Sequence, residues 1–155
     1  MTTKNHVYID YFQSPIGTIE LTASGKGVTS LYFKNSHHKV NRCDLLDKVK
    51  VQLTEYFNGK RKAFDVALDL QGTSFQQQVW QQLLNVGFGK TDSYGSLAQK
   101  LNNPKAVRAV GAANGKNPVS IIVPCHRIIG SNGKLTGYAG GLDRKEWLLK
   151  HEGVF

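Results

Sequence analysis

The first third of the chain consists of short runs of β-branched and aromatic residues separated by turn-forming residues. The runs cover residues 7–12, 18–22 and 28–33, and the tetrapeptides Ser-Pro-Ile-Gly and Ser-Gly-Lys-Gly stand between them. Runs of this length predict strands, and turns this short join neighbouring strands in opposite directions. We therefore expect an antiparallel meander.

A helical spacing of apolar residues follows the third run. Over residues 43–57 the apolar residues recur every three to four positions, which predicts an amphipathic helix that ends at Asn58-Gly59. Residues 64–70 are expected to form one more strand, and the Gln71-Gly72 pair that follows suggests a domain boundary.

Beyond that boundary the pattern stays helical. Thr73 or Ser74 is expected to cap a helix that directs its apolar residues, Trp80 among them, inward. The chain closes with an amphipathic helix over residues 143–151, which Gly153 terminates.

Two short helices joined by a tight polar turn are expected between these two. Ser93 can cap a helix over residues 94–101, and Asn103 can cap another over residues 104–114, with Pro104 at its first position. This is a helix-turn-helix pattern. The second helix is rich in Ala and Gly, which permits another helix or a ligand to approach its backbone closely.

Together these elements predict an α+β fold with two domains. Residues 1–70 would form a small antiparallel sheet domain with one helix, and residues 71–155 a mostly helical domain that carries the helix-turn-helix. The composition, 40% hydrophobic and 20% charged over 155 residues, is ordinary for a globular protein. No apolar run approaches the ~20 residues that span a bilayer, and the N-terminus lacks a signal-peptide core. We expect a cytoplasmic protein with no membrane partner.

The net charge is +9, and the distribution of this charge along the chain is more informative about function than its size. No acidic residue occurs from Ser93 to Leu142, whereas this stretch contains six basic residues: Lys100, Lys105, Arg108, Lys116, Arg127 and Lys134. A positive surface of this kind suits a phosphate backbone. A solvated basic face without a specific partner is the alternative that charge alone leaves open.

Candidate chemistry lies at Cys125, one of two cysteines in the chain. A free thiol titrates near ~8.5, so it needs help to react at neutral pH. His126 is a candidate base, Arg127 would make the surroundings cationic, and Glu152 is a candidate to orient the imidazole. Neighbouring residues of an extended segment point to opposite faces, so adjacency does not guarantee a direct contact between Cys125 and His126, and a bridging water would connect them. An inert buried thiol beside an ordinary histidine is the alternative.

The residues around Cys125 resemble a known active-site signature. Asn-Pro-Val-Ser-Ile-Ile-Val-Pro-Cys-His-Arg-Ile-Ile-Gly at residues 117–130 is similar to that of the O6-alkylguanine-DNA alkyltransferases, also called methylated-DNA–protein-cysteine methyltransferases. Further matches follow in the same order and spacing at residues 75–80, 93–98, 103–111, 137–141 and 144–153. The similarity is dense over residues 72–155 and looser over 1–70, and the Ogt-type bacterial branch is the most similar.

The resemblance implies an RNase H-like first domain and a winged helix-turn-helix second domain. It implies that Cys125 is the alkyl acceptor, that His126 draws its proton through a water, and that Glu152 holds the imidazole. Asn117 would bridge the turn that builds the site, and Tyr94 would donate a proton or a hydrogen bond to the guanine ring.

The resemblance also implies how DNA and the base are bound. Arg108 would fill the space left by the flipped base while its helix lies in the minor groove, a placement that the Ala/Gly face permits. The remaining DNA contacts would come from Ser93, Lys105, Ala106 and Ala109. The loop with Tyr138, Ala139 and Gly140 would contact the O6 edge of the base. Backbone carbonyls near Cys125 and Ile128 would accept from its exocyclic amine.

The implied reaction is direct repair of double-stranded DNA by a single-turnover S-methyltransferase, because the thioether product is not hydrolysed. O6-alkylguanine is the expected lesion, and O4-alkylthymine and cooperative binding of a monomer to DNA stay open. No cofactor is expected. Many members have Ser where this chain has Ala139, which leaves the range of alkyl groups open. Some members bind zinc in the first domain, but with only Cys43, His6, His37 and His38 there we expect no metal.

Two other functions remain as alternatives. A DNA-binding sensor would share the fold without transferring the alkyl group, although such proteins lack the acceptor cysteine. A Cys/His hydrolase or acyltransferase would turn over ester or amide substrates and would need no helix-turn-helix.

Overall fold

The computed structural model describes residues 7–35 and 37–155, which separate into two compact units. The first unit ends at Gln71 and the second begins at Gly72. In the described part of the chain, no helix is both long and apolar enough to cross a membrane.

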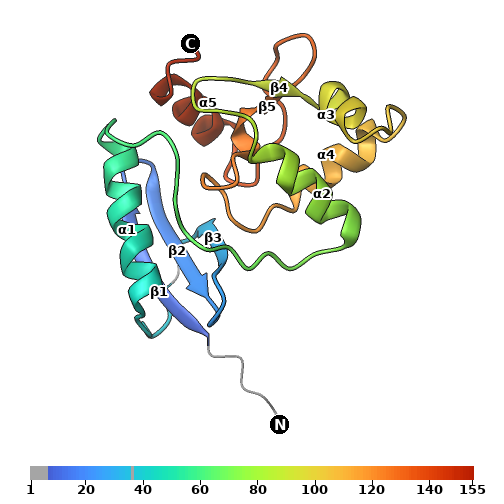
Figure 1. The fold of residues 1–155 in the computed structure, drawn as a ribbon. Helices are drawn as coiled ribbons and strands as arrows, with labels where there is room; N and C mark the ends of the chain where they lie inside the picture. Colours follow the sequence, from blue (N-terminus) through green and yellow to red (C-terminus); the bar gives the residue numbers. More distant parts are fainter. Residues whose placement is uncertain (1–6, 36) are drawn as a thin grey trace. The chain divides into compact units, whose positions relative to one another are not determined.

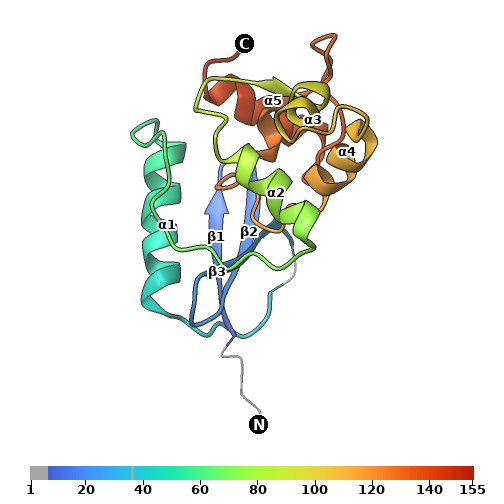
Figure 2. The ribbon, with the colours of Figure 1, turned by 45° about the vertical axis from the view of Figure 1, so that its right-hand side comes forward.

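An antiparallel meander with one helix forms the first unit. Strands β1 (Tyr8–Ser14), β2 (Gly17–Ala23) and β3 (Val28–Phe33) pair in sequence order. Helix α1 (Asp44–Phe57) lies along one face of this sheet, as Figures 1 and 2 show. The strands alternate inward and outward residues, and the inward set packs against Leu46, Val49 and Leu53 of α1 in a fully buried core.

The strand expected over residues 64–70 does not form. Only a single parallel bridge joins Leu68 to Val28, although Gly27 lets this segment come so close that a Cβ there would lie 2.6 Å from the Leu68 backbone. The Gln52 side chain instead bonds both the N–H and the C=O of Asp65, at 2.9 and 3.2 Å. A glutamine from α1 thus takes the place of a partner strand at Asp65, while the backbone of Ala67 and Asp69 bonds that of Val28.

The second unit begins with three helices: α2 (Ser74–Leu83), α3 (Tyr94–Lys100) and α4 (Val107–Gly115). Thr73 and Gln76 form a reciprocal capping box at α2, and the Ser93 hydroxyl caps α3. Trp80 is buried and donates to the Ala113 carbonyl at 2.9 Å, which fixes α2 against α4.

The second helix of the helix-turn-helix begins three residues later than expected. Asn103 does not cap it, and Pro104 lies in the turn before Val107. The N–H groups of Asn102 and Asn103 instead bond back to Gln99 and Ala98, while Asn102 adopts a left-handed φ of 59°. This is a Schellman ending of α3, and it uses the residues that a helix starting at Pro104 would need.

The rest of the second unit places two short segments side by side. Strand β4 (Asp92–Ser93) pairs in parallel with β5 (Ile128–Ile129), directly after the one-turn 3₁₀ helix η1 (Cys125–Arg127). The expectation of an extended backbone at Cys125 is therefore wrong. Helix α5 (Leu142–His151) follows, and Gly153, whose φ is 82°, lies just after its C-cap residue Glu152.

Candidate active site

A strained turn leads into Cys125. The Asn117 side chain donates to the Val123 carbonyl at 2.7 Å and accepts from the Val119 N–H at 3.0 Å, so it bridges the turn as expected. Inside the turn, Ile121 has a φ of 71°, a conformation that costs a β-branched residue about 1–3 kcal/mol. The amide of Asn117 holds the backbone in this shape.

Cys125 is a buried thiol with a mixed environment. Only 4% of the residue is exposed, and this burial raises the thiol pKa. The nearby polar side chains of Asn117 and Ser120 and the positive charge of Lys145 favour the thiolate, so they lower the thiol pKa and oppose the effect of burial. The pocket therefore keeps a protonated thiol at rest, next to groups that stabilise its anion.

A buried ion cluster lies beside the thiol. Glu152 accepts from His126 Nε2 at 2.7 Å and from Arg127 Nε and an Arg127 terminal nitrogen at 2.8 and 3.0 Å. Burial opposes ionisation of Glu152, but these donors lower its pKa to about 2. Arg127 also donates to the Val86 carbonyl, so its charge serves Glu152 and does not line the thiol as the sequence suggested.

The cluster determines which nitrogen of His126 can act as a base. Burial lowers the His126 pKa, so the ring is neutral at physiological pH. The ionised Glu152 carboxylate can only accept, which requires the hydrogen on Nε2 and leaves Nδ1 unprotonated. In the described chain Nδ1 has no hydrogen-bond partner, and His126 makes no bond to Cys125. A water-bridged proton transfer fits this arrangement better than a direct one.

A recess of about 380 Å³ opens in the same unit, within the ~300–1,000 Å³ range of small-molecule sites. It brings together residues of α3, α4 and the glycine-rich loop: Tyr94, Val107, Gly111, Gly115, Gly137, Tyr138 and Ala139. Three of them were expected to bind the base. Cys125 itself does not line the recess, but the centroid of the Tyr138 ring lies 6.5 Å from that of His126. The Tyr138 hydroxyl is buried, and its burial, together with the negative charge of a Cys125 thiolate, raises the Tyr138 pKa.

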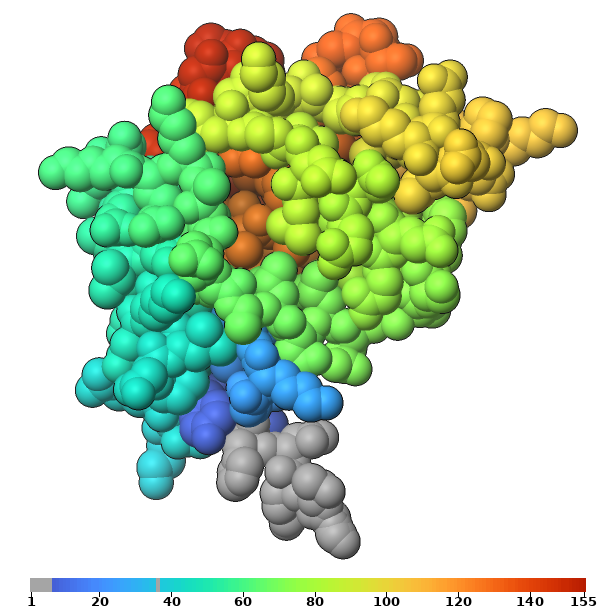
Figure 3. Space-filling view, viewed as in Figure 1, coloured from blue at the N-terminus to red at the C-terminus, as the bar shows by residue number. Residues whose placement is uncertain are grey.

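The residues expected to contact DNA differ in their accessibility. Lys105, Arg108 and Ala109 are exposed, and Arg108 is the second residue of α4. Ala106 is half-buried, and the Ser93 hydroxyl already accepts from the Ser96 N–H as a helix cap. The surface carried by α2 and by the turn between α3 and α4 is open to solvent in Figure 3.

The positive surface is smaller than the acid-free stretch of sequence suggests. Arg127 is buried, and Lys100 forms a 2.7 Å ion pair with Asp92 from just outside that stretch. Lys105, Arg108, Lys116 and Lys134 are exposed.

Two residues near the site, Lys145 and Thr136, were not among the site residues predicted from the sequence. Lys145 is fully buried and donates to the carbonyls of Ile128 and Thr136, while Ile128 itself is also buried. The Thr136 hydroxyl bonds the Tyr94 hydroxyl at 2.6 Å. Lys145 stands three and four residues before the buried Leu148 and Leu149, and this helical spacing could have predicted its burial. The sequence around Thr136 has no pattern that predicts its contact.

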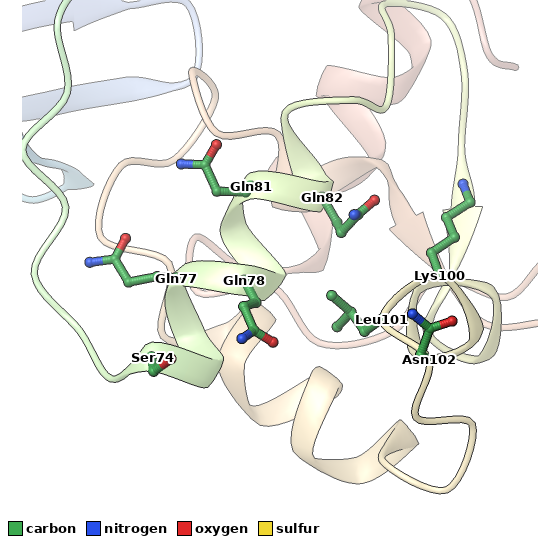
Figure 4. Close-up of a pocket in the computed structure, with 8 residues that line it drawn as sticks. All are labelled: Ser74, Gln77, Gln78, Gln81, Gln82, Lys100, Leu101 and Asn102. Carbon is green, nitrogen blue, oxygen red and sulfur yellow. The ribbon is translucent and has the colours of Figure 1, made fainter.

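A second hollow, of about 610 Å³, lies between α2 and the end of α3. Its lining is mostly neutral and polar: Ser74, Gln77, Gln78, Gln81, Gln82, Lys100, Leu101 and Asn102 (Figure 4). None of the expected site residues lines it.

The first unit offers no assembled metal site in the described ranges, where no group of three His, Cys, Asp or Glu side chains converges. His37 packs on Tyr11, and the His38 N–H donates to the Tyr11 hydroxyl. Cys43 precedes α1, and His6 lies outside the described residues.

Both halves of the chain match models of one protein family. Residues 7–70 match the ribonuclease-like domain of 6-O-methylguanine DNA methyltransferase, and residues 74–154 match its DNA binding domain.

Similar proteins extend over nearly the whole chain. The methylated-DNA–protein-cysteine methyltransferase of Methanosarcina mazei is 50% identical, over 94% of this chain and 97% of its own length. The Haemophilus influenzae protein of the same name is 41% identical, over 96% and 87%. The crystal structure of O6-methylguanine methyltransferase from Mycobacterium tuberculosis superposes with a TM-score of 0.87 at 44% identity, over 95% and 93%. The M. tuberculosis OGT in complex with DNA gives 0.84 at 46% identity, over 92% and 91%.

Proposed function

The chain belongs to the 6-O-methylguanine DNA methyltransferase family, and from this premise we propose that it repairs double-stranded DNA by transferring an alkyl group from guanine O6 to Sγ of Cys125. The observation that carries the proposal is the buried set around this thiol: a strained turn, polar and cationic side chains that favour its anion, and a neutral imidazole whose Nδ1 has no hydrogen-bond partner among the described residues. An inert thiol needs none of these.

The reaction begins with extrusion of the damaged nucleotide, because O6 lies inside the base stack and no side chain reaches it there. Helix α4 lies in the minor groove, where its exposed Ala109 and small neighbours allow close approach, and Arg108 fills the space that the base leaves. Lys105 and the main chain around Ala106 and Ser93 bind the adjacent backbone.

The extruded base enters the recess beside Tyr94. Tyr138, Ala139 and Gly140 lie along its O6 edge, and the carbonyls of Cys125 and Ile128 accept from its exocyclic amine. Ala139 has no hydroxyl, so O6 is contacted by a backbone amide at this position. O4-alkylthymine presents a similar alkyl ether to the same recess, so it is the second lesion to test.

Transfer then exchanges one bond for another. The S–C bond forms as the O6–C bond breaks, the thiol proton passes through a water to His126 Nδ1, and Glu152 stabilises the imidazolium that results. The guanine ring leaves with a hydrogen bond or a proton from Tyr94. Because a thioether is not hydrolysed under ordinary conditions, each molecule reacts once.

The setting follows from the chemistry. The acceptor must remain a free thiol and the substrate is DNA, which together favour the reducing cytoplasm. The protein acts as a monomer, and adjacent molecules on one duplex are free to bind cooperatively.

The proposal is tested by incubating the protein with a duplex that contains one O6-methylguanine. We expect the intact mass to rise by one methyl group and repair to stop at one equivalent of lesion per protein. Binding without a mass gain would identify a lesion sensor. Repeated turnover, on this duplex or on ester substrates, would identify a hydrolase or acyltransferase and overturn the proposal.

A further inference from the structure

Thr136 connects the glycine-rich loop to the helix-turn-helix. Its hydroxyl lies 2.6 Å from that of Tyr94, the first residue of α3, although the two are 42 positions apart in the chain. Both side chains are half-buried, and Tyr94 lines the recess together with the next loop residues, Gly137 and Tyr138. The loop is therefore hydrogen-bonded to a residue that lines the recess.

Lys145 holds the same segment from the other side. Its side chain is fully buried, and Nζ donates to the Thr136 carbonyl at 2.8 Å and to the Ile128 carbonyl. No carboxylate pairs with Nζ in the described chain, and burial lowers the Lys145 pKa to about 8. Burying an ammonium group without a carboxylate partner costs desolvation free energy, and an apolar side chain of the same length would avoid that cost.

We propose that Lys145 and Thr136 are positioning residues that clamp the base recess: Lys145 fixes the carbonyls of Ile128 and Thr136, and the Thr136 hydroxyl in turn fixes the phenol of Tyr94. The clamp rests on the proposed function, because it orients the groups that would contact the alkylated guanine.

The clamp has a defined chemical effect. When Thr136 donates to the Tyr94 oxygen, the phenol hydrogen is left for the guanine ring, and a hydroxyl that accepts one hydrogen bond becomes a better donor in the next. A carbonyl has two lone pairs, so Ile128 can accept from Lys145 and from the exocyclic amine of the base together. Neither Thr136 nor Lys145 needs to touch a reacting atom.

The first test is a double-mutant cycle between Thr136 and Tyr94, read as the single-turnover rate constant with an O6-methylguanine duplex in saturating excess. Thr136→Val keeps the shape and removes the hydroxyl, and we expect it to slow transfer about fivefold to tenfold, the effect of one lost hydrogen bond. In the Tyr94→Phe background the same change should alter the rate less than about twofold. Thr136→Ser, which restores a hydroxyl, should return most of the rate.

The second test follows the loop itself by hydrogen exchange of the full-length protein. Lys145→Met removes the ammonium group, and we expect faster exchange in the peptide that covers residues 130–141. Lys150→Met is the matched control, since Lys150 is an exposed lysine on the same helix, and it should leave that exchange unchanged.

The outcomes separate the clamp from the function it serves. A wild-type protein that does not transfer at all would refute the proposed function. Wild-type transfer together with an undiminished Thr136→Val effect in Tyr94→Phe would refute the clamp alone, and so would unchanged loop exchange in Lys145→Met. If Lys145→Met fails to fold, the Thr136 cycle still decides, because it does not need that variant.

Discussion

At the residue scale, the chemistry of Cys125 depends on several side chains, of which only some are its neighbours in the sequence. His126 and Glu152 were predictable, the first by adjacency and the second as a rare acid in a basic half, and the structure brings them within 2.7 Å. Arg127 was misjudged because η1 turns its side chain toward Glu152 instead of the thiol. The charge near the sulfur comes from Lys145, which only tertiary packing brings there.

Glu152 offers a prediction about stability and pH. Its folded pKa of about 2 lies below the ~4.3 of an unfolded glutamate, so its ionisation stabilises the fold fully above about pH 4.3. That contribution, on the order of 3 kcal/mol, is lost as the pH falls from there toward 2. We expect Glu152→Gln to lower the free energy of unfolding clearly at pH 7 and much less at pH 3, as urea titrations would measure.

Glu146→Gln is the control for this comparison. Glu146 lies on the same helix but pairs with Lys150 on the surface, so its replacement should change the free energy of unfolding by less than about 0.5 kcal/mol at either pH. An equal loss for Glu152→Gln at both pH values would contradict the assigned pKa.

At the element scale, the helix caps were predictable, whereas two element boundaries were decided by competing hydrogen bonds. Thr73 and Ser93 cap their helices because a cap needs only its own next three residues. The predictions of a strand over residues 64–70 and of the first residue of α4 were wrong for different reasons. In the first, Gln52 bonds the backbone of Asp65, and the pairing with β3 is limited to bonds with Val28. Before the second, the ending of α3 uses the backbone of Asn102 and Asn103.

The turn between α3 and α4 can be tested through Asn102. Its left-handed φ is strained for most residues, tolerated by Asn and free for Gly. Asn102→Ala should therefore destabilise the protein by about 1 kcal/mol, whereas Asn102→Gly should be nearly neutral. Thermal unfolding of the two variants measures this, and equal destabilisation would argue against a Schellman ending.

Helix α4 provides the test of DNA recognition. Arg108→Ala should weaken binding to an O6-methylguanine duplex more than binding to the undamaged duplex, because the arginine replaces a flipped base only at the lesion. Lys116→Ala, an exposed cation at the other end of α4, should weaken both about equally. Fluorescence anisotropy with the two duplexes gives the comparison, and equal losses for Arg108→Ala would remove its role as the inserted side chain.

At the scale of the whole molecule, the sequence predicted a first domain with a sheet and one helix, a mostly helical second domain and a basic net charge. The structure separates into one unit that ends at Gln71 and another that begins at Gly72, and every expected site residue lies in the second unit. The recess was not predictable, because it is assembled from α3, α4 and a loop that contact one another only in the folded unit. The first unit supplies a sheet and a helix with none of the proposed chemistry.

The net charge of +9 predicts how binding responds to salt. The logarithm of the affinity for undamaged duplex should fall linearly with the logarithm of salt concentration, since phosphate contacts release counterions. The ratio of lesion to undamaged affinity should change far less, because flipping and base contacts release none. A binding constant insensitive to salt would contradict a DNA partner.

The central claim concerns one sulfur atom, and peptide mapping by mass spectrometry tests it most directly. After reaction with an O6-methylguanine duplex, we expect the methyl group on the peptide that contains Cys125, with Cys43 unmodified, and no methylated peptide from Cys125→Ser although this variant still binds the duplex. A methyl group on any other residue, or an unmodified Cys125 after the lesion has been repaired, would contradict the account.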